Sequence, residues 1–494
     1  MRERGSKMSK KLLFGTCLLL LASCSVGPDY RRPDFYSDAR LQKSLNLKPG
    51  ADKVSLYWYR DFNDPVLNSL IDDGLRQSTD VKIAIEKMRQ ARQNLRINSV
   101  KYLPTVDASG SYYYLKDSRA YTGEPLSTDY FQLGLDAAWE IDIWGGGRRL
   151  TEQSKALFAA TSANLQNVQL ALTAEIASTY VQLRQAQEQL HNARRNEALQ
   201  SSLYDLVKRK YEAGLTDDIS YNQASYLLSS TRETIPQLEA SVNTLQNSLA
   251  TLTSKLPGEI NDRLAAGETN LVRQPLRYDT SRLYQLPVGV IRNRPDIRAL
   301  EYQLMAQNAA VGQAIAELFP NVSLSAFWGY QSKNMSSLIG GGSNTYNYSP
   351  AVKLPIFHWG ALVNNVELQK SLTRENALQY KQGILNAASE IKNAADNVEK
   401  EYRRNRETEK SLASQQEVAD LTNAKYQNGL VDFSEVLTAQ QNLLNAQNSR
   451  IESNADIYNY IISFYKAVGG GYDISSIPDT RKAGRGAAGA LCKG

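Results

Sequence analysis

The sequence predicts a mixed α+β membrane protein built from two structural repeats, each with two β-strands and long coiled-coil helices. Three observations predict this fold: landmarks that recur about 215 residues apart, segments that alternate in polarity, and apolar residues at helical spacing over nearly 70 residues. The chain has 494 residues, of which 42% are hydrophobic and 22% charged, so it has enough apolar material for a large core.

The recurring landmarks pair the first half of the chain with the second half, in the same order and at nearly the same spacing. They are Leu103-Pro104 with Phe319-Pro320, Trp144-Gly145 with Trp359-Gly360, Tyr211 to Leu215 with Tyr426 to Leu430, and Leu227-Leu228 with Leu443-Leu444. An internal repeat of this kind indicates that each half is one supersecondary unit, and that both halves have the same element order.

After each Trp-Gly landmark, helical periodicity continues for nearly 70 residues. In the first half, apolar residues spaced three and four apart form a coiled-coil seam from Leu165 to Leu190. A helix over 147–213 would be roughly 100 Å long at the usual rise per residue. It is expected to stop at Gly214, and its counterpart at Gly429, because glycine accepts the left-handed conformation that caps a helix.

Each long helix has two shorter companions. Return helices are expected over 219–255 and 432–467, and upstream helices over 80–103 and 295–319. The return and upstream helices, at roughly 38 and roughly 23 residues, together nearly equal the long helix in length. We therefore expect the two short helices of each half to stack end to end as a second full-length column.

The strand candidates are the alternating segments 106–114, 130–141, 322–330 and 346–356. Four strands leave open edges, which a membrane barrel does not tolerate, so the chain must oligomerise or stay out of the bilayer. Three copies would supply about 12 strands and as many helical columns, enough for a 12-stranded β-barrel continued by an α-helical barrel. Aromatic residues near the strand ends suit membrane interfaces or a core equally well; they are Trp139, Trp144, Trp328 and Trp359.

Residues 1–23 are expected to be a signal peptide, because basic residues precede a short apolar run that is too short to cross a bilayer as a helix. The run ends in Leu21-Ala22-Ser23-Cys24, which resembles the lipobox of bacterial lipoproteins, so Cys24 is predicted to be lipidated. An ordinary signal peptide with a chance cysteine is the alternative. Ser25 follows, instead of the Asp that resembles an inner-membrane retention signal, which favours the outer membrane.

The remaining chain offers little material for an enzyme. Without residues 1–23 the formal net charge falls from +6 to about +2, which is too near neutral to indicate nucleic-acid binding. Two His and three Cys leave few ligands for a zinc site or a catalytic His, and the P-loop, Rossmann and HExxH motifs are absent. We expect no catalysis, no metal, and no cofactor beyond the covalent lipid at Cys24.

The predicted organisation along the chain has six parts, around an equatorial region in the middle of the helical part. They are the signal peptide (1–23), a lipidated N-terminal segment that packs on the equatorial region (24–79), the first repeat (80–255), an equatorial linker (256–294), the second repeat (295–467), and a C-terminal equatorial segment with a disordered tail (468–494).

With these features the chain resembles the outer membrane factor family, the TolC-like exit ducts of bacterial efflux and type I secretion systems. The most specific pieces are Arg294-Pro295-Asp296-Ile297, Leu354 to Gly360 and Tyr465 to Tyr472. Together with the lipobox they resemble the lipoprotein branch that serves resistance-nodulation-division pumps. The resemblance implies a homotrimer in the cell outer membrane that extends into the periplasm, a periplasmic adaptor (membrane fusion) protein, and an inner-membrane pump.

The resemblance also implies a gate at the turns between the long helices and the return helices. Carried over by motif, the gate candidates are Ser220 in the first half and Asp432, Glu435, Thr438 and Gln441 in the second. Some relatives have an Asp and an Arg where this chain has Thr438 and Gln441. A charged latch at that pair is therefore not expected.

Two further features of these turns have alternative interpretations. Gly214-Leu215 and Gly429-Leu430 resemble adaptor-docking elements of the family, although a local hydrophobic contact at the cap would also explain the leucines. Asp217 and Asp218, with the acidic gate candidates, could form a ring that favours cations. Solvated carboxylates that the helix dipole favours are the alternative.

Three functions fit this sequence. The first is a passive efflux duct that carries drugs or other small toxic compounds from the pump to the exterior, and the lipobox and the Arg-Pro-Asp segment favour it. The second is a type I protein-secretion duct of the same fold. The third is a periplasmic coiled-coil lipoprotein scaffold without a channel, which leaves the alternating strands unexplained. The substrate, which a passive tube does not select, is not encoded in any motif.

Overall fold

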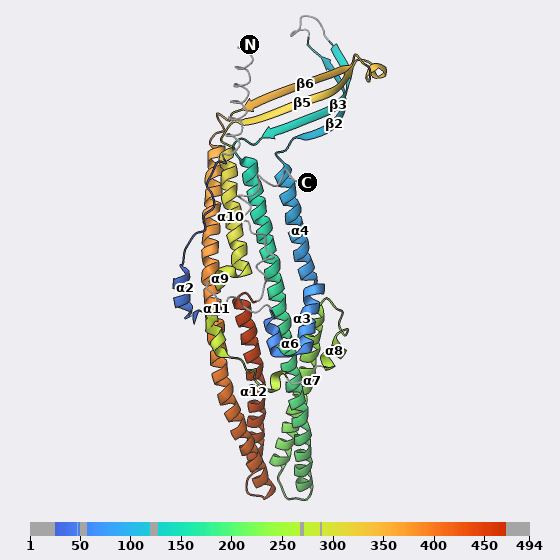
Figure 1. The fold of residues 1–494 in the computed structure, drawn as a ribbon. Helices are drawn as coiled ribbons and strands as arrows, with labels where there is room; N and C mark the ends of the chain where they lie inside the picture. Colours follow the sequence, from blue (N-terminus) through green and yellow to red (C-terminus); the bar gives the residue numbers. More distant parts are fainter. Residues whose placement is uncertain are drawn as a thin grey trace.

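The computed structural model is an elongated molecule with a strand sheet at one end and helices along the rest of its length (Figure 1). It describes residues 25–46, 48–49, 57–118, 127–266, 271–286 and 289–470. The predicted lipidation site Cys24, the signal peptide, and the tail after residue 470 lie outside the described residues.

The helices that run along the molecule have the same order in both halves. The first half has α4 (Thr79–Val100), α6 (Gly146–Glu212) and α7 (Asp218–Leu252); the second has α10 (Pro295–Ala316), α11 (Ala361–Gln427) and α12 (Phe433–Ala467). Both long helices have 67 residues and both return helices have 35. None of the described helices combines the length and apolar composition that a membrane-spanning helix needs.

Shorter elements surround the middle of the helical part. They are α2 (Asp38–Leu45), β1 (Lys48–Pro49), a 3-10 turn at Trp58–Phe62, α3 (Pro65–Gln77), α8 (Asn261–Ala266), 3-10 turns at Leu271–Arg273 and Thr280–Tyr284, β4 (Gln285–Leu286) and α9 (Val290–Asn293). β1 and β4 pair in parallel. These elements form the equatorial region, and α3 packs there on α6.

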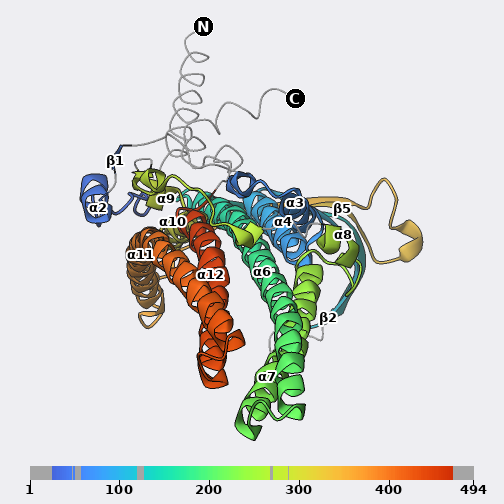
Figure 2. The same ribbon diagram turned by 90° about the horizontal axis from the view of Figure 1, so that it is seen from below.

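Viewed along its length, the helical part is a curved layer with α11 at one edge and α4 and α7 at the other (Figure 2). Above the equatorial region the neighbours are α11, α10, α6 and α4; below it they are α11, α12, α6 and α7. Each half thus contributes one long helix and one column made of two shorter helices. The layer ends at two edges whose helices have a helical neighbour on one side.

The two short helices of each half are joined end to end through side chains, and the joints differ in chemistry. In the first half, the Ser254 hydroxyl accepts a hydrogen bond from the backbone N–H of Thr79 at 2.9 Å, which caps the start of α4 at the end of α7. In the second half, Arg294 before α10 donates to the carbonyl of Ala467 at 2.7 Å, which satisfies the end of α12. The expected end-to-end columns are therefore present.

Arg294 also anchors this joint to the neighbouring long helix. Its buried guanidinium pairs with Asp296 and with Glu390 of α11, each at 2.7 Å. Burial alone would lower the pKa of Arg294, but the hydrogen bonds to the two carboxylates outweigh it and the pKa is raised. The Arg-Pro-Asp segment therefore holds three helices together at one point.

The main core lies in the equatorial region, where the short elements fill the space around the joints. Trp58 stacks on Tyr465 of α12, with ring centroids 5.3 Å apart. Below it the buried hydroxyl of Tyr180 donates to Asp64 at 2.7 Å and accepts from Arg184 at 2.9 Å. Aromatic burial and a satisfied polar network make this region the rigid middle of a long molecule.

The first described residues lie above the equatorial region on which the N-terminal segment was expected to pack. The N–H of Val26 donates to the carbonyl of Trp144 at 3.0 Å, at the base of the strand sheet. Arg149 of α6 donates to the carbonyls of Val26 and Gly27, each at 3.1 Å, and to Asp29 at 2.9 Å. Only from α2 onward does the segment lie beside the equatorial region.

The sheet has four antiparallel strands in the order β2 (Thr105–Lys116), β3 (Ser127–Ile141), β5 (Asn321–Ser332) and β6 (Asn344–Lys353). Its two halves join through β3 and β5, where Leu135 lies opposite Trp328. β2 and β6 are the edges and have no second strand neighbour among the described residues. The open four-stranded sheet expected from the sequence is therefore present.

Replacing Arg294 by Met should destabilise the protein by about 3 kcal/mol, because it leaves two carboxylates and a helix-end carbonyl without their buried partner. Thermal unfolding in detergent would measure this loss. Lys370→Met removes an exposed pair with Glu367 on the surface of α11 and serves as the control. Equal unfolding temperatures for the Arg294 and Lys370 variants would contradict the anchoring role of Arg294.

Candidate functional site

The far ends of the helices form two similar turns, which we call the tips: residues 213–217 between α6 and α7, and residues 428–432 between α11 and α12. At the first tip, Gly214 N–H bonds to the Tyr211 carbonyl and Leu215 N–H to the Lys210 carbonyl. The second tip repeats both bonds with Gly429 and Leu430. This pattern is a Schellman cap, and both glycines have positive φ, which explains why glycine stands at each position.

The leucine after each capping glycine is exposed. Leu215 is 75% exposed and Leu430 is 72% exposed, so neither makes the local hydrophobic contact that could have explained it. Both turns thus present an apolar side chain to the solvent at the extreme end of the molecule. An exposed apolar residue repeated at two equivalent positions is typical of a surface that binds another protein.

The acidic tip residues lie at the starts of the return helices. Asp217 is the N-cap of α7, and its carboxylate accepts from the backbone N–H of Ser220 at 2.9 Å, which lowers its pKa. Asp432 is the N-cap residue of α12 but its carboxylate makes no capping bond. Asp218 and Glu435 follow in the first turns of the two helices. All four are exposed, where the helix dipole favours negative charge.

The gate candidates come from two different helices. Ser220 lies in the first turn of α7, while Thr438 and Gln441 lie on exposed positions of α12. The Thr438 hydroxyl donates to the Ser434 carbonyl of its own helix at 2.9 Å. Among the described residues no hydrogen bond joins Ser220 to Thr438 or Gln441, so one copy of the chain does not bring these candidates together.

The structure reveals a contact between the two tips that the sequence analysis missed. The Lys210 ammonium of α6 lies 4.4 Å from the ring centroid of Tyr426 at the end of α11, a cation–π distance. Tyr426 also packs edge-on against Phe433, with centroids 5.4 Å apart, and both join a buried cluster with Val207 and Val436. Tyr426 was recognised only as a landmark of the repeat, and its pairing with Lys210 had no local signal.

The two faces of the strand sheet differ in chemistry. The register places Val106 and Leu135 on one face, and Asp107, Asp136 and Asn347 on the other. The first face is apolar and mostly exposed; it also carries Tyr112, Leu133, Trp139, Leu324, Trp328, Tyr346, Tyr348 and Val352. An exposed apolar face opposite a polar face is the pattern of a strand that separates lipid from water.

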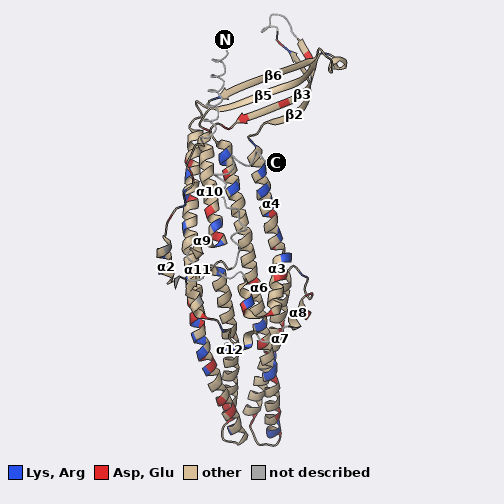
Figure 3. Ribbon diagram, in the orientation of Figure 1, with Lys and Arg blue, Asp and Glu red and all other residues tan. Residues whose placement is uncertain are grey.

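The charged residues are distributed accordingly. Figure 3 shows many Lys, Arg, Asp and Glu along the helices and few on the strands. Aromatic residues lie where the strands meet the helices: the Trp144 indole donates to the Pro320 carbonyl at 2.8 Å and stacks on Phe319. Its counterpart Trp359 is 87% exposed. The repeat therefore places one Trp in a contact and leaves the equivalent Trp uncovered.

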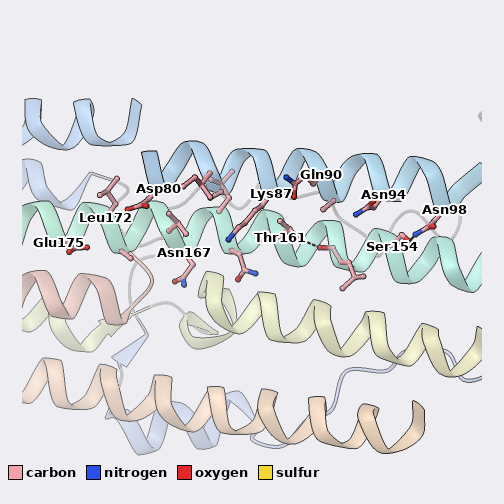
Figure 4. Close-up of a pocket in the computed structure, with 18 residues that line it drawn as sticks. Asp80, Lys87, Gln90, Asn94, Asn98, Ser154, Thr161, Asn167, Leu172 and Glu175 are labelled. Atoms are coloured by element: carbon pink, nitrogen blue, oxygen red, sulfur yellow. Dashed lines mark hydrogen bonds between the residues drawn. The ribbon is translucent and has the colours of Figure 1, made fainter. Parts of the chain in front are cut away.

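A long groove of about 970 Å³ runs between α4 and α6 (Figure 4). Its floor includes the buried Ala84 and Leu172, and its rim carries the exposed Asp80, Lys87 and Glu175. Within the described residues no three His, Cys, Asp or Glu side chains gather in a metal-binding arrangement. The groove marks the edge of the curved layer, where α4 has α6 beside it.

A family model described as outer membrane efflux protein matches residues 70–255 and 286–470. The chain belongs to the outer membrane efflux protein family. The two matched segments lie in the two halves of the repeat. Membership agrees with the helical part, the strand sheet with one apolar face, and the tips, and it assigns the chain to the outer membrane.

Several curated relatives align over almost the whole chain. Nodulation protein T of Rhizobium leguminosarum bv. trifolii is 29% identical over 92% of this chain and 96% of its own length. The solvent efflux pump outer membrane protein SrpC of Pseudomonas putida is 29% identical, with coverage of 93% and 97%. The cation efflux system protein CusC of Escherichia coli K12 is 28% identical, with coverage of 93% and 99%. These names indicate different cargoes on a shared architecture.

Solved structures give the same result. The outer-membrane channel OprN is 30% identical, with a TM-score of 0.81 and coverage of 91% of this chain and 99% of that one. The CmeC outer membrane channel of Campylobacter jejuni is 27% identical, with a TM-score of 0.82 and coverage of 93% and 97%. The TolC-like fold expected from the sequence is thus confirmed for a single copy of the chain.

The cap at Asp217 should make the start of α7 sensitive to acid. Its folded pKa is lowered, so the stabilisation is present above the unfolded pKa and is lost as the pH falls through the folded value. Hydrogen-exchange protection of the peptide containing Ser220 should fall below pH 4 in the parent chain. Asp217→Asn keeps a cap that does not titrate and should abolish this drop. A drop of the same size in that variant would contradict the assignment.

Proposed function

We propose that this protein is the passive exit duct of a tripartite efflux system, a homotrimer that carries small toxic compounds through a gated channel to the exterior. The observation that carries the proposal is the open sheet of a family member from the outer membrane. Its β2 and β6 edges have no second strand neighbour among the described residues, and one of its faces is apolar and exposed. Such a sheet is incompatible with a bilayer until further strands close it.

Three copies would close the sheet into a barrel of about 12 strands, within the range of outer-membrane barrels. The apolar face would contact lipid and the polar face, with Asp107 and Asp136, would face the channel. The two edges of the helical layer would meet in the same way, since α4 and α11 each lack a helical neighbour on one side. At 67 residues, each long helix reaches roughly 100 Å from the membrane, which suits a tunnel across the periplasm.

The position of the first described residues supports a lipid anchor at Cys24. Val26 is held beside Trp144 at the base of the sheet, next to the apolar strand face. A lipid attached two residues earlier would need no linker to reach the inner surface of the membrane. An N-terminus held in the equatorial region would lie too far from the bilayer for an acyl chain to insert.

The tips are proposed to dock a periplasmic adaptor through Leu215 and Leu430, and to carry the gate. Ser220, Asp432, Glu435, Thr438 and Gln441 would approach their equivalents only when three copies surround one axis. The exposed carboxylates would then form an acidic ring that favours cations at the entrance. The adaptor, in turn, would connect the duct to an inner-membrane resistance-nodulation-division pump.

The efflux role is favoured over the two alternatives by the relatives. Those that are named for a transport role are efflux pump components for solvents, antibiotics or cations, which favours small-molecule export over type I protein secretion. A scaffold without a channel would have no use for a sheet with an apolar and a polar face. The protein is proposed to catalyse no reaction, because duct, pump and adaptor divide the work of transport.

Purified protein reconstituted into a planar bilayer should form small, gated conductances, and native mass spectrometry should find a trimer. Thr438→Asp with Gln441→Asp would place like charges around the axis and should raise the open probability. A monomer that never conducts would exclude the duct and favour the scaffold.

Replacing both Leu215 and Leu430 by Ser should abolish drug resistance in a strain that depends on this duct, because the adaptor would lose its apolar contacts. Conductance and trimer mass should stay unchanged, since neither side chain packs in the fold. Leu256→Ser, at an equally exposed leucine in the equatorial region, is the matched control and should keep resistance. Full resistance in the double variant would exclude docking at these leucines.

A further inference from the structure

The internal repeat gives α6 and α11 equivalent faces, of which only one is covered. The two long helices have equal length, as do the two return helices, so a shift of 215 residues superimposes the helical hairpin α6–α7 on the hairpin α11–α12. Below the equatorial region α6 packs between α7 and α12. The corresponding neighbours of α11 are α12, which is present, and the α7 of another copy.

Contacts between the two hairpins of one chain therefore describe what a second copy would meet. Near the middle, Asn192 and Asn196 of α6 donate to the Gln447 side chain of α12 at 3.1 and 2.9 Å. At the tip, Lys210 lies over Tyr426. At the membrane end, the Trp144 indole donates to the Pro320 carbonyl.

Shifting these pairs by the repeat gives residues of matching chemistry in every case. Asn192 becomes Glu407 of α11, and Gln447 becomes Arg232 of α7, which is an ion pair in place of an amide pair. Lys210 and Tyr426 become Lys425 and Tyr211, again a lysine and a tyrosine. Glu407, Lys425 and Tyr211 are exposed in a single copy, and the Arg232 side chain is 55% exposed.

The surroundings add charge to the second pair. Asp218 hydrogen-bonds to the Tyr211 hydroxyl, so the Lys425 ammonium would meet both an aromatic ring and a carboxylate. Inside the chain the place equivalent to Asp218 is Phe433, which is buried and apolar. At the membrane end, exposed Trp359 would reach the Pro104 carbonyl, the counterpart of Pro320.

We propose that α11 of one copy docks on α7 of a second copy through Glu407 with Arg232 and Lys425 with Tyr211, which we call the copy interface. This inference rests on the proposed trimer and specifies its contacts. The junction inside each chain is held by amides, Lys210 and a buried apolar cluster, whereas the copy interface is held by opposite charges. Charge pairs that are exposed to water weaken with salt, so the tips would separate between copies before they separate within one.

Cysteine cross-linking in membranes tests the contact directly. In full-length chain carrying Cys492→Ser, the pair Glu407→Cys and Arg232→Cys should give dimers and trimers on a denaturing gel after treatment with a short bismaleimide. The yield should exceed that of either single variant at least tenfold. The pair Asn192→Cys and Gln447→Cys is the matched control, because it should cross-link within one chain and stay monomeric.

The outcomes separate this inference from the proposed function. A trimer by native mass without the 407–232 cross-link would overturn the copy interface and leave the duct intact. A monomer by native mass would overturn the trimer itself. A cross-linked product with a different protein, instead of a second copy, would also overturn the inference.

Charge reversal provides a second test that does not depend on cysteines. Glu407→Arg alone should place two cations together and raise the open probability in a bilayer several-fold. Adding Arg232→Glu should restore the parent value, because the ion pair re-forms with its signs exchanged. Failure of the second change to rescue the first, in a chain that still forms trimers, would contradict the pairing.

Discussion

The rest of this structure depends on one constraint: a strand edge cannot be left unpaired in the hydrocarbon of a membrane. The backbone N–H and C=O groups along β2 and β6 need partners, and lipid offers none. One chain has too few strands to supply them to itself. The four-stranded sheet is therefore a fraction of a barrel, and the curved helical layer beneath it is the same fraction of a tube.

The second constraint is continuity between the barrel and the helices below it. The long helices run through the equatorial region without a break, while the partner column is interrupted in both halves at that level. The interruptions make room for the short elements that build the core around Trp58 and Tyr465. Ser254 and Arg294 then restore the hydrogen bonding that a continuous helix would have had. A molecule this long thereby obtains a rigid middle without a globular domain.

Much of the fold could be predicted from sequence because its signals are local. Helical spacing, alternation in the strands, and a glycine at each tip specify elements whose partners are adjacent in the chain. The role of Arg294 could not be derived, since its partners Glu390 and Ala467 are 96 and 173 residues away. The same holds for Lys210 and Tyr426. The start of the chain was placed too low because its ties to Trp144 and Arg149 are backbone contacts that leave no pattern in the sequence.

The site was predictable only as far as a single copy completes it. The sequence located the tips and the exposed leucines, but the gate candidates remain apart in one chain. A repeat makes this incompleteness measurable, because equivalent residues should have equivalent surroundings in a closed ring. Tyr426 is 6% exposed and Tyr211 is 39% exposed; Trp144 is partly buried and Trp359 almost uncovered. Each pair has one sequence context and two environments, and the difference marks the surface at which the next chain belongs.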